Sequence, residues 1–284
     1  MSTGNSRAAV KYEFIRNATA RLHYAGRVFL LDPMLSTKGA FRPFAGIAPN
    51  PVVDLPTAVD DVVEGIDAVV VSHLHPDHFD DAAVRILSTD LPVYTPNNTN
   101  APDRAHPSER QSFQAALQGH GFTDVRLIDC GDGRGSEFSG VAMHQTWARH
   151  GRGLVGELIG EVNGIVFEAN GYPTIYWAGD TVYDEVEIGT ILGRFRPDVV
   201  IAHTGGPVIE AVSPEILLMD AVEGLRFFEH ANQINAGVQM IAVHMEALDH
   251  CFSTREHMRD QRDGLNEHLA SRFHIPADGE ALTL

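Results

Sequence analysis

Residues 73–78 read His-Leu-His-Pro-Asp-His, and this segment places four metal-binding side chains within six positions. It directly follows the apolar run Ala68 to Val71, which has the composition of a buried strand. Imidazole and carboxylate ligands suit Zn²⁺, Mn²⁺ or Fe²⁺, whereas a thiolate-rich set favours zinc or an iron–sulfur cluster. Ligand side chains at this density favour a metal site over a patch of surface histidines.

The spacing within this segment divides its ligands between two ions. Side chains of an extended chain alternate in direction, so His73 and His75 point the same way. Asp77 and His78 then turn toward a neighbouring position. We therefore predict that His73 and His75 bind one divalent metal ion, and that Asp77 and His78 bind a second.

Each metal needs further ligands, and the candidates follow other apolar runs. His150 is the predicted third ligand of the first metal, because it follows a strand and precedes a glycine that lets the backbone approach closely. His144 is the alternative, although it lies inside an alternating strand pattern. Asp180 can bridge both ions with its two carboxylate oxygens, and His244 can complete the second site.

Short apolar runs that end abruptly at a polar residue recur along the chain. Continuous apolar runs of this length are typical of strands buried on both faces, and reactive side chains collect beyond the carboxyl ends of such strands. Residues distant in sequence should therefore converge on one site. The runs end before Asp32, Ser72, Asp180, His203 and His244.

The remaining patterns predict one α/β domain over residues 1–284, with two sheets face to face and helices outside. Alternating patterns predict half-exposed antiparallel strands, and apolar residues at helical spacing predict helices between the buried strands. Two Gly- and Pro-rich stretches predict irregular structure, of which Met34–Pro56 is either a lid or an inert surface loop. The predicted strands are Val10–Ile15, Arg21–Tyr24, Val141–Gln145 and Glu161–Glu168, the helices are Asp80–Ser88, Ile216–Asn232 and Thr254–Ser271, and the second irregular stretch is Leu91–Ser108.

Composition narrows the classes of partner. Lys and Arg number 21 against 38 Asp and Glu, and a net charge of −17 repels nucleic acid and anionic membrane surfaces. The chain has neither a long apolar run nor the apolar core of a signal peptide near its start, so we expect a cytoplasmic protein with a small-molecule substrate. Cys130 and Cys251 form no paired-thiolate motif and are interpreted as small, partly buried hydrophobes. Whether the chain forms a homo-oligomer is left open.

The order of these motifs resembles the metallo-β-lactamase superfamily, specifically its UlaG-like branch of metal-dependent hydrolases. The resemblance runs from Leu31-Asp32-Pro33 to residues 276–280. It implies an αββα sandwich of two mixed sheets with a dinuclear site at one edge, and it implies the same ligand assignment. The motifs that carry it are His73-x-His75-x-Asp77-His78, His150, Gly179-Asp180-Thr181 and His244.

Departures from related families narrow the chemistry. Flavodiiron oxygen reductases of this superfamily have Glu at the position of His75, so an oxygen-reducing site is disfavoured. Zinc β-lactamases with a Cys ligand need a thiol in the second site, where this chain has Asp180. The basic arm of tRNA-processing relatives is missing, and sulfur dioxygenases and glyoxalase-like thioesterases typically have Gly-Gly soon after the cluster, where this chain has Phe79-Asp80-Asp81.

Two metal ions about 3.5 to 4 Å apart can present a bridging hydroxide as nucleophile. Asp77 and Asp180 would orient it, and the substrate would be the carbonyl of a lactone, ester or amide. A metal-dependent phosphodiesterase is the alternative enzyme, and a non-catalytic metal-binding scaffold or sensor is the alternative from another class.

Further roles are open between chemistry and structure. His203 either donates to an oxyanion or leaving group, or forms a hydrogen bond in the core. Tyr183 either assists the substrate carbonyl, as the tyrosine at this spacing does in similar lactonases, or packs on the surface. Asp32 either accepts a hydrogen bond from a ligand imidazole or starts a turn before Pro33. We also predict that Glu246 and His250 shape the surroundings of the second metal.

Overall fold

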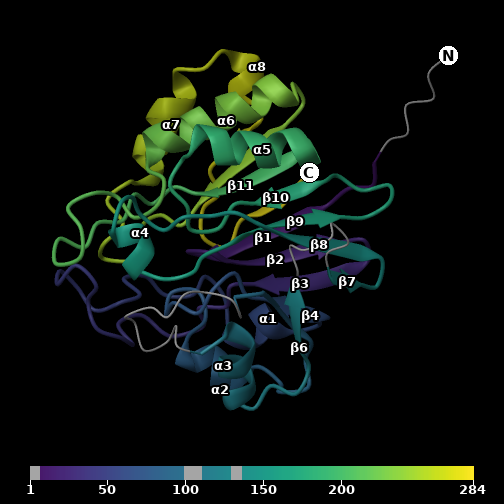
Figure 1. The fold of residues 1–284 in the computed structure, drawn as a ribbon, viewed down its shortest axis with the longest axis vertical. Coiled ribbons are helices and arrows are strands. Elements are labelled where there is room, and N and C mark those ends of the chain that lie inside the picture. Colours follow the sequence, from purple (N-terminus) through teal and green to yellow (C-terminus); the bar gives the residue numbers. More distant parts are fainter. Residues whose placement is uncertain (1–6, 99–110, 129–135) are drawn as a thin grey trace.

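The computed structural model describes residues 7–98, 111–128 and 136–284. Its strands form two seven-stranded sheets that lie face to face, with α1–α3 outside the first sheet and α5–α8 outside the second (Figure 1). The strand order is β14-β1-β2-β3-β4-β5-β6 in the first sheet and β13-β12-β11-β10-β9-β8-β7 in the second. The predicted αββα sandwich of two mixed sheets is confirmed.

The two sheets have the same internal plan. In each, antiparallel strands on one side give way to parallel strands on the other, so β3–β6 and β10–β13 run parallel within their sheets. The first sheet comprises β1 (Lys11–Arg16), β2 (Thr19–Tyr24), β3 (Arg27–Leu31), β4 (Ala68–Val70), β5 (Val93–Pro96), β6 (Val125–Ile128) and β14 (Ala281–Thr283). The second comprises β7 (Ser136–Phe138), β8 (Val141–Thr146), β9 (Gly164–Glu168), β10 (Ile175–Trp177), β11 (Val199–His203), β12 (Gln239–Val243) and β13 (Phe273–His274).

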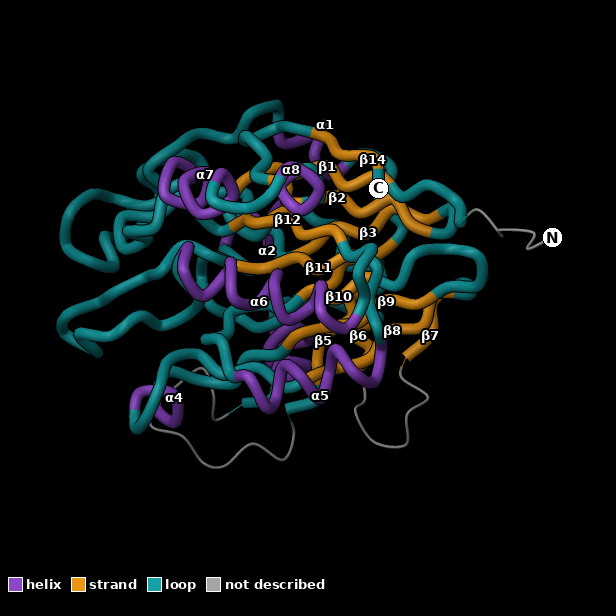
Figure 2. Tube along the Cα trace, turned by 90° about the horizontal axis from the view of Figure 1, so that it is seen from above, coloured by secondary structure: helices purple, strands orange, loops and turns teal. Residues whose placement is uncertain are grey.

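The helices connect the parallel strands and cover the outer faces. Three short helices precede or separate the strands of the first sheet, and longer ones follow β10 and β11 in the second (Figure 2). They are α1 (Val59–Val63), α2 (Asp81–Ile86), α3 (Phe113–Gly119), α4 (Val155–Leu158), α5 (Glu185–Phe195), α6 (Ala221–Ile234), α7 (Arg255–Asp263) and α8 (Glu267–Ala270).

Apolar side chains form three layers around the sheets. Strand β4 contributes to two of them, because Val70 packs between the sheets whereas Val69 faces α1–α3. In β11, Ile201 likewise packs between the sheets and Val200 faces α5 and α6. These strands are therefore buried on both faces, as their continuous apolar runs predicted.

Most predicted elements lie within a few residues of the observed ones, but two helices differ. The helix predicted over Ile216–Asn232 begins only at Ala221, where the Asp220 side chain accepts from the backbone of Glu223. The preceding residues form loop hydrogen bonds instead, including one from the Leu217 N–H to the Pro207 carbonyl.

The helix predicted over Thr254–Ser271 is two helices. Helix α7 ends at Asp263, with Gly264 as its C-cap, and α8 starts after Asn266, whose side chain accepts from the Leu269 N–H. An asparagine cap in the middle of the pattern starts a new helix.

Of the two stretches predicted to be irregular, Met34–Pro56 contains no helix or strand. The buried guanidinium of Arg16 fastens it by donating to the carbonyls of Met34, Ser36 and Val53. The second prediction, Leu91–Ser108, is wrong at its start, where Val93–Pro96 form β5, and its later part lies outside the described residues. Within the described ranges, no helix combines the length and hydropathy needed to cross a membrane.

Candidate metal centre

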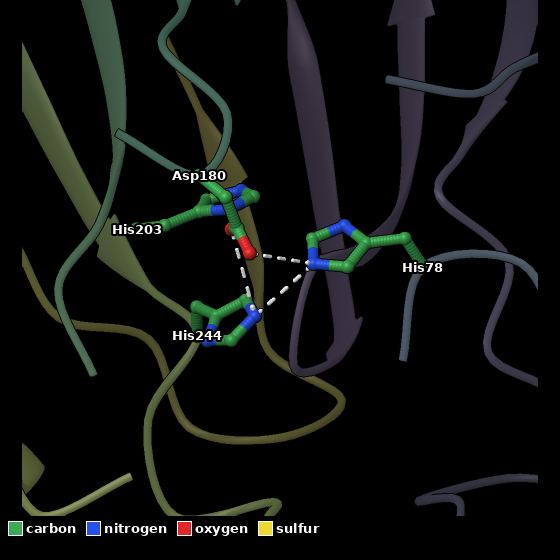
Figure 3. Close-up of side chains that lie close together, drawn as sticks. All are labelled: His78, Asp180, His203 and His244. Atoms are coloured by element: carbon green, nitrogen blue, oxygen red, sulfur yellow. Dashed lines mark hydrogen bonds and ion pairs between the residues drawn. The ribbon is translucent and has the colours of Figure 1, made fainter. Parts of the chain in front are cut away.

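The ends of strands from both sheets bring the predicted ligands together. The first sheet supplies the 73–78 segment just beyond β4, and the second supplies Asp180, His203 and His244 at or beyond the ends of β10, β11 and β12. His150 comes from the loop that follows β8. In Figure 3, His78 approaches from one side and meets Asp180, His203 and His244 from the other.

His73, His75 and His150 form one group. Their ligand atoms lie within 4.8 Å of one another, and His73 Nε2 is 3.1 Å from His75 Nδ1. Two of these imidazoles are buried and His75 is half-buried. This is the set of three histidines that the sequence assigned to the first metal.

A second group surrounds His78 and His244, whose Nε2 atoms are 3.2 Å apart. Together with Asp180 and His203, they offer ligand atoms within 4.8 Å of one another. The Asp77 carboxylate lies beside this group, with Oδ2 3.3 Å from His244 Nε2 and 3.6 Å from His78 Nε2. All seven predicted ligands are therefore near neighbours, in two groups.

Asp180 lies between the two groups. Its Oδ2 atom is 3.1 Å from His78 Nε2, and it is 3.5 Å from His150 Nε2 in the other group. Its Oδ1 atom is 3.6 Å from His244 Nε2. A carboxylate so placed has contacts on both sides, as its predicted bridging role requires.

Each imidazole of the first group has one nitrogen engaged by an outer partner. His150 Nδ1–H donates to the Leu217 carbonyl at 2.8 Å, and His75 Nε2–H donates to the Ile159 carbonyl at 3.1 Å. His73 Nδ1 is 2.9 Å from Ser72 Oγ. The other nitrogens face the cluster, and such outer hydrogen bonds fix the tautomer of a metal-binding histidine.

The second group has charged or polarisable outer partners. His78 Nδ1–H donates to Asp32 Oδ2 at 2.6 Å, so Asp32 has the role predicted for it rather than that of a turn residue alone. His244 Nδ1 lies 3.7 Å from the thiol of Cys251. The donor chemistry of both groups thus fits divalent ions bound by imidazole and carboxylate.

The electrostatics of the two groups are opposite. Burial, reinforced by the charge of His150, lowers the pKa of His75 to about 4. Burial also opposes protonation of His78, but the carboxylates of Asp180, Asp77 and Asp32 outweigh it and raise its pKa to about 10. The first group is consequently neutral, whereas the second combines carboxylates with imidazoles that favour a proton.

Two backbone positions beside the ligands require glycine or strain. Gly179, which precedes Asp180, has φ +66°, and a Cβ there would lie 2.4 Å from the Asn163 carbonyl oxygen. His244 itself has φ +66° without being glycine, and Gly205 makes room for its backbone, because a Cβ there would meet the His244 carbonyl oxygen at 2.0 Å. Strained backbone of this kind concentrates at functional sites.

His203 and Tyr183 occupy different surroundings. His203 is fully buried, its Nδ1–H donates to Asp180 Oδ1 at 2.6 Å, and its Nε2 accepts from the Trp177 indole at 3.0 Å. Both nitrogens are thus engaged within the protein. The Tyr183 hydroxyl is 3.0 Å from His230 Nδ1 on α6, and its contacts give no support to the predicted catalytic role.

Three residues near the ligands have partners that the sequence did not identify. Glu246 accepts from the backbone and guanidinium of Arg255, and these contacts give no support to its predicted place beside the second metal. Cys251 is half-buried and packs among apolar side chains, as predicted, and its thiol also contacts His244. Cys130 lies outside the described residues. Trp177 was missed, because nothing in a single sequence pairs its indole with His203.

Comparison with known proteins agrees with this geometry. Residues 27–245 match the model of the β-lactamase superfamily domain. The protein YddR of Bacillus subtilis (strain 168), assigned to UPF0173, is 30% identical over 275 residues, which cover 95% of this chain and 98% of YddR. A second UPF0173 protein, described as a metal-dependent hydrolase of Xanthobacter autotrophicus, is 23% identical and covers 72% of this chain.

Two solved structures match over nearly the whole chain. A possible metal-dependent hydrolase from Veillonella parvula has a TM-score of 0.83 at 30% identity, covering 98% of this chain and 100% of its own. An isothiocyanate hydrolase from Delia radicum gut bacteria has a TM-score of 0.80 at 32% identity, covering 96% of this chain and 98% of its own. These descriptions support the hydrolase class. The chain belongs to the metallo-β-lactamase superfamily.

Proposed function

We propose that the protein is a dinuclear metal-dependent hydrolase that adds water to a small, neutral, electrophilic carbon. One observation carries this proposal: two groups of imidazole nitrogens face a shared carboxylate, Asp180, while the outward nitrogens of these histidines are engaged elsewhere. A site built only for folding stability would not need so many buried histidines aimed at one point.

The residues divide the work between binding and orientation. His73, His75 and His150 would hold one ion, and His78, His244 and Asp77 the other, with Asp180 shared between them. Such a pair of divalent ions, most simply Zn²⁺ with Mn²⁺ or Fe²⁺ as alternatives, supplies a hydroxide at neutral pH and polarises the substrate.

Two carboxylates remain ionised for this task. Burial opposes ionisation of Asp77 and Asp180, but the neighbouring imidazoles of His78 and His244 outweigh it and hold the pKa of both carboxyls well below the usual range. Asp77 Oδ2 can therefore accept a hydrogen bond from the attacking water. His203 Nδ1–H orients Asp180 and, with both its nitrogens engaged, acts as a positioning residue rather than as an acid.

The proposed substrate class is based on the net charge of the chain and on its similarity to a hydrolase of known structure. A net charge of −17 disfavours polyanionic substrates. A lactone, ester or amide carbonyl satisfies the site, and the 32% identical isothiocyanate hydrolase favours a second candidate, the central carbon of an isothiocyanate. Addition of water to R–N=C=S gives a thiocarbamic acid, which releases the amine R–NH₂ and carbonyl sulfide, so that atoms balance without a redox partner.

The test is a substrate panel with zinc-loaded protein. Phenethyl isothiocyanate, a γ-lactone and p-nitrophenyl acetate represent the proposed class, and bis(p-nitrophenyl) phosphate represents phosphodiesters. We expect turnover of at least one member of the proposed class, loss of turnover in His75→Ala, and normal turnover in His144→Ala, whose imidazole pairs with Glu168 outside the centre. Cleavage of the phosphodiester alone would replace the proposal with a phosphodiesterase, and no turnover at all would favour a metal-binding scaffold.

A further inference from the structure

Three loops are linked to the metal centre, two directly by hydrogen bonds to its predicted ligands and one through the segment that follows His244. Residues 151–160, which contain α4, are joined to His75 through the Ile159 carbonyl. Residues 207–217 are joined to His150 through the Leu217 carbonyl. Both links are hydrogen bonds to predicted metal ligands, so the positions of these loops are tied to the geometry of the centre.

The third loop, residues 41–50, is fastened by Asp249. The Asp249 carboxylate accepts from the backbone N–H of Phe44 at 2.9 Å and of Ile47 at 3.0 Å, and from the Asn50 side chain at 2.8 Å. The backbone N–H groups of Ala45 and Ala48 add longer bonds. Although burial opposes ionisation, these bonds lower the pKa of Asp249 to about 2, so the clamp holds across neutral pH.

Apolar packing joins this loop to the second ligand group. Phe41 and Phe44 pack against a buried cluster of Met34, Ala247 and Leu248, and Cys251 packs against the same cluster. The thiol of Cys251 in turn lies 3.7 Å from His244 Nδ1. The 41–50 loop is thus tied both to Asp249 and to the segment that follows His244. Whether Met34–Pro56 is a lid or a surface loop stays a prediction.

Of the eight large apolar side chains that are exposed in the described part of the chain, four lie on these three loops. Ile47 is 66% exposed, Leu154 is 75% exposed and Leu158 is 56% exposed. Val212, on the loop joined to His150, is 49% exposed. The loops and α4 lie at the same end of the molecule, on the left in Figure 1. We call Ile47, Leu154, Leu158 and Val212 the apolar rim.

Exposing these apolar side chains to water is unfavourable, and a binding function would explain why they are exposed. Large apolar side chains gathered on one part of a surface mark a place that binds an apolar partner. Here two of the loops that carry these side chains are hydrogen-bonded to His75 and His150, and the third packs against the segment that follows His244. The net charge of −17 disfavours a negatively charged bound group.

We propose that the apolar rim binds the organic group of the substrate, so that the enzyme prefers substrates whose reacting carbon carries an alkyl or aryl chain. This inference rests on the proposed function, because it assumes that the reacting carbon is bound at the centre. The rim residues determine specificity, and the ligands of the two metals perform the chemistry.

Binding of n-alkyl hydroxamic acids to the zinc-loaded protein tests this inference without turnover. The hydroxamate binds metal, and chains of two to eight carbons probe the rim. Full burial of a methylene gives about fourfold in affinity, so partial burial against one wall should tighten Kd roughly twofold per methylene. We expect the triple variant Ile47→Ser, Leu154→Ser, Leu158→Ser to lose this dependence while acetohydroxamate binding and zinc content stay unchanged.

Val186 on α5 provides a matched control, because it is 74% exposed and lies on a helix that covers the outer face of the second sheet. Val186→Ser should keep the full dependence on chain length. An equal dependence in the triple variant and the wild type would overturn the inference, as would a wild type indifferent to chain length. Conversion of a wild-type dimer into monomers by the triple variant, with unchanged hydroxamate binding, would also overturn it and assign the rim to a second copy of the chain.

The outcome is separable from the test of catalysis. If zinc-loaded protein turns over no substrate in the panel but binds hydroxamates with a rim-dependent preference for long chains, the proposed hydrolysis fails and the inference stands. Turnover that is equally fast for short and long esters, together with a flat hydroxamate series, contradicts only the inference.

Discussion

The two ligand groups of the metal centre differ in what lies behind them. Uncharged partners support the first group: the Ser72 hydroxyl behind His73, and the backbone carbonyls of Ile159 and Leu217 behind His75 and His150. The second group contains Asp77 and has the Asp32 carboxylate behind His78. Only the first group includes a half-buried ligand, His75.

This difference predicts that the two positions bind their metal ions with unequal affinity. A carboxylate behind an imidazole raises its basicity as a ligand, and the anionic set of the second group attracts a cation more strongly. We therefore expect the second position to bind its metal more tightly, and the more open first position to exchange its metal and receive the substrate. The following experiments either sharpen this contrast or remove it.

The largest effect should follow loss of the shared carboxylate. Asp180→Ala removes a group that contacts ligands of both positions, so it should cost more than the roughly 10–100-fold in metal affinity or activity typical of an outer partner. Elemental analysis after dialysis should show both ions depleted. A variant that retains one full equivalent would mean that Asp180 serves a single position.

Single ligand substitutions should separate the two positions. We expect His75→Ala to retain about one metal equivalent, in the second position, because the ligands of that group are intact. His244→Ala should retain less than one equivalent under the same dialysis, since only the weaker position remains. Equal retention by the two variants would remove the proposed asymmetry.

Asp32→Asn should weaken the second position selectively. Asp32 accepts directly from His78, whereas its hydrogen-bonded link to the first group runs through Ser72, whose hydroxyl donates to Oδ2 and lies 2.9 Å from His73 Nδ1. Competition with a chromophoric chelator should show a 10- to 100-fold loss of affinity at the second position, as is typical for such outer partners, and a smaller loss at the first. Asp67→Asn is the control, because that carboxylate also accepts from a backbone N–H, that of Val28, but precedes β4, whereas the ligand segment follows that strand. Comparable losses in the two variants would assign the effect to general destabilisation.

The smallest expected effect is a difference in proton release. In metal-free protein near pH 7.5, the raised pKa of His78, about 10, leaves it protonated, whereas the lowered pKa of His75, about 4, leaves it neutral. Filling the second position therefore releases a proton, and affinity there should rise with pH until His78 deprotonates. Metal binding at the first position should release no proton. Calorimetry in buffers of different ionisation enthalpy measures both steps, and identical proton counts would contradict the assignment.

Much of the fold could be predicted from the sequence, because the residue patterns that indicate strands are local. Apolar runs such as Val69–Val71, which end at a polar residue, identified parallel strands buried on both faces, and alternating runs identified the antiparallel strands beside them. Helix boundaries were less legible. The helix predicted from Ile216 starts only after the Asp220 cap, because preceding residues such as Leu217 form hydrogen bonds to other loops.

The sequence by itself determined which side chains can bind metal and in which order they occur along the chain, because ligand type and spacing within a turn are local properties. Only the tertiary structure decided how His203 is used, since its partners Asp180 and Trp177 come from another strand. It also decided that Asp249 fixes the 41–50 loop, a contact between residues about 200 positions apart. Hydrogen bonds across such separations depend on how two sheets pack, and no single stretch of sequence contains both partners.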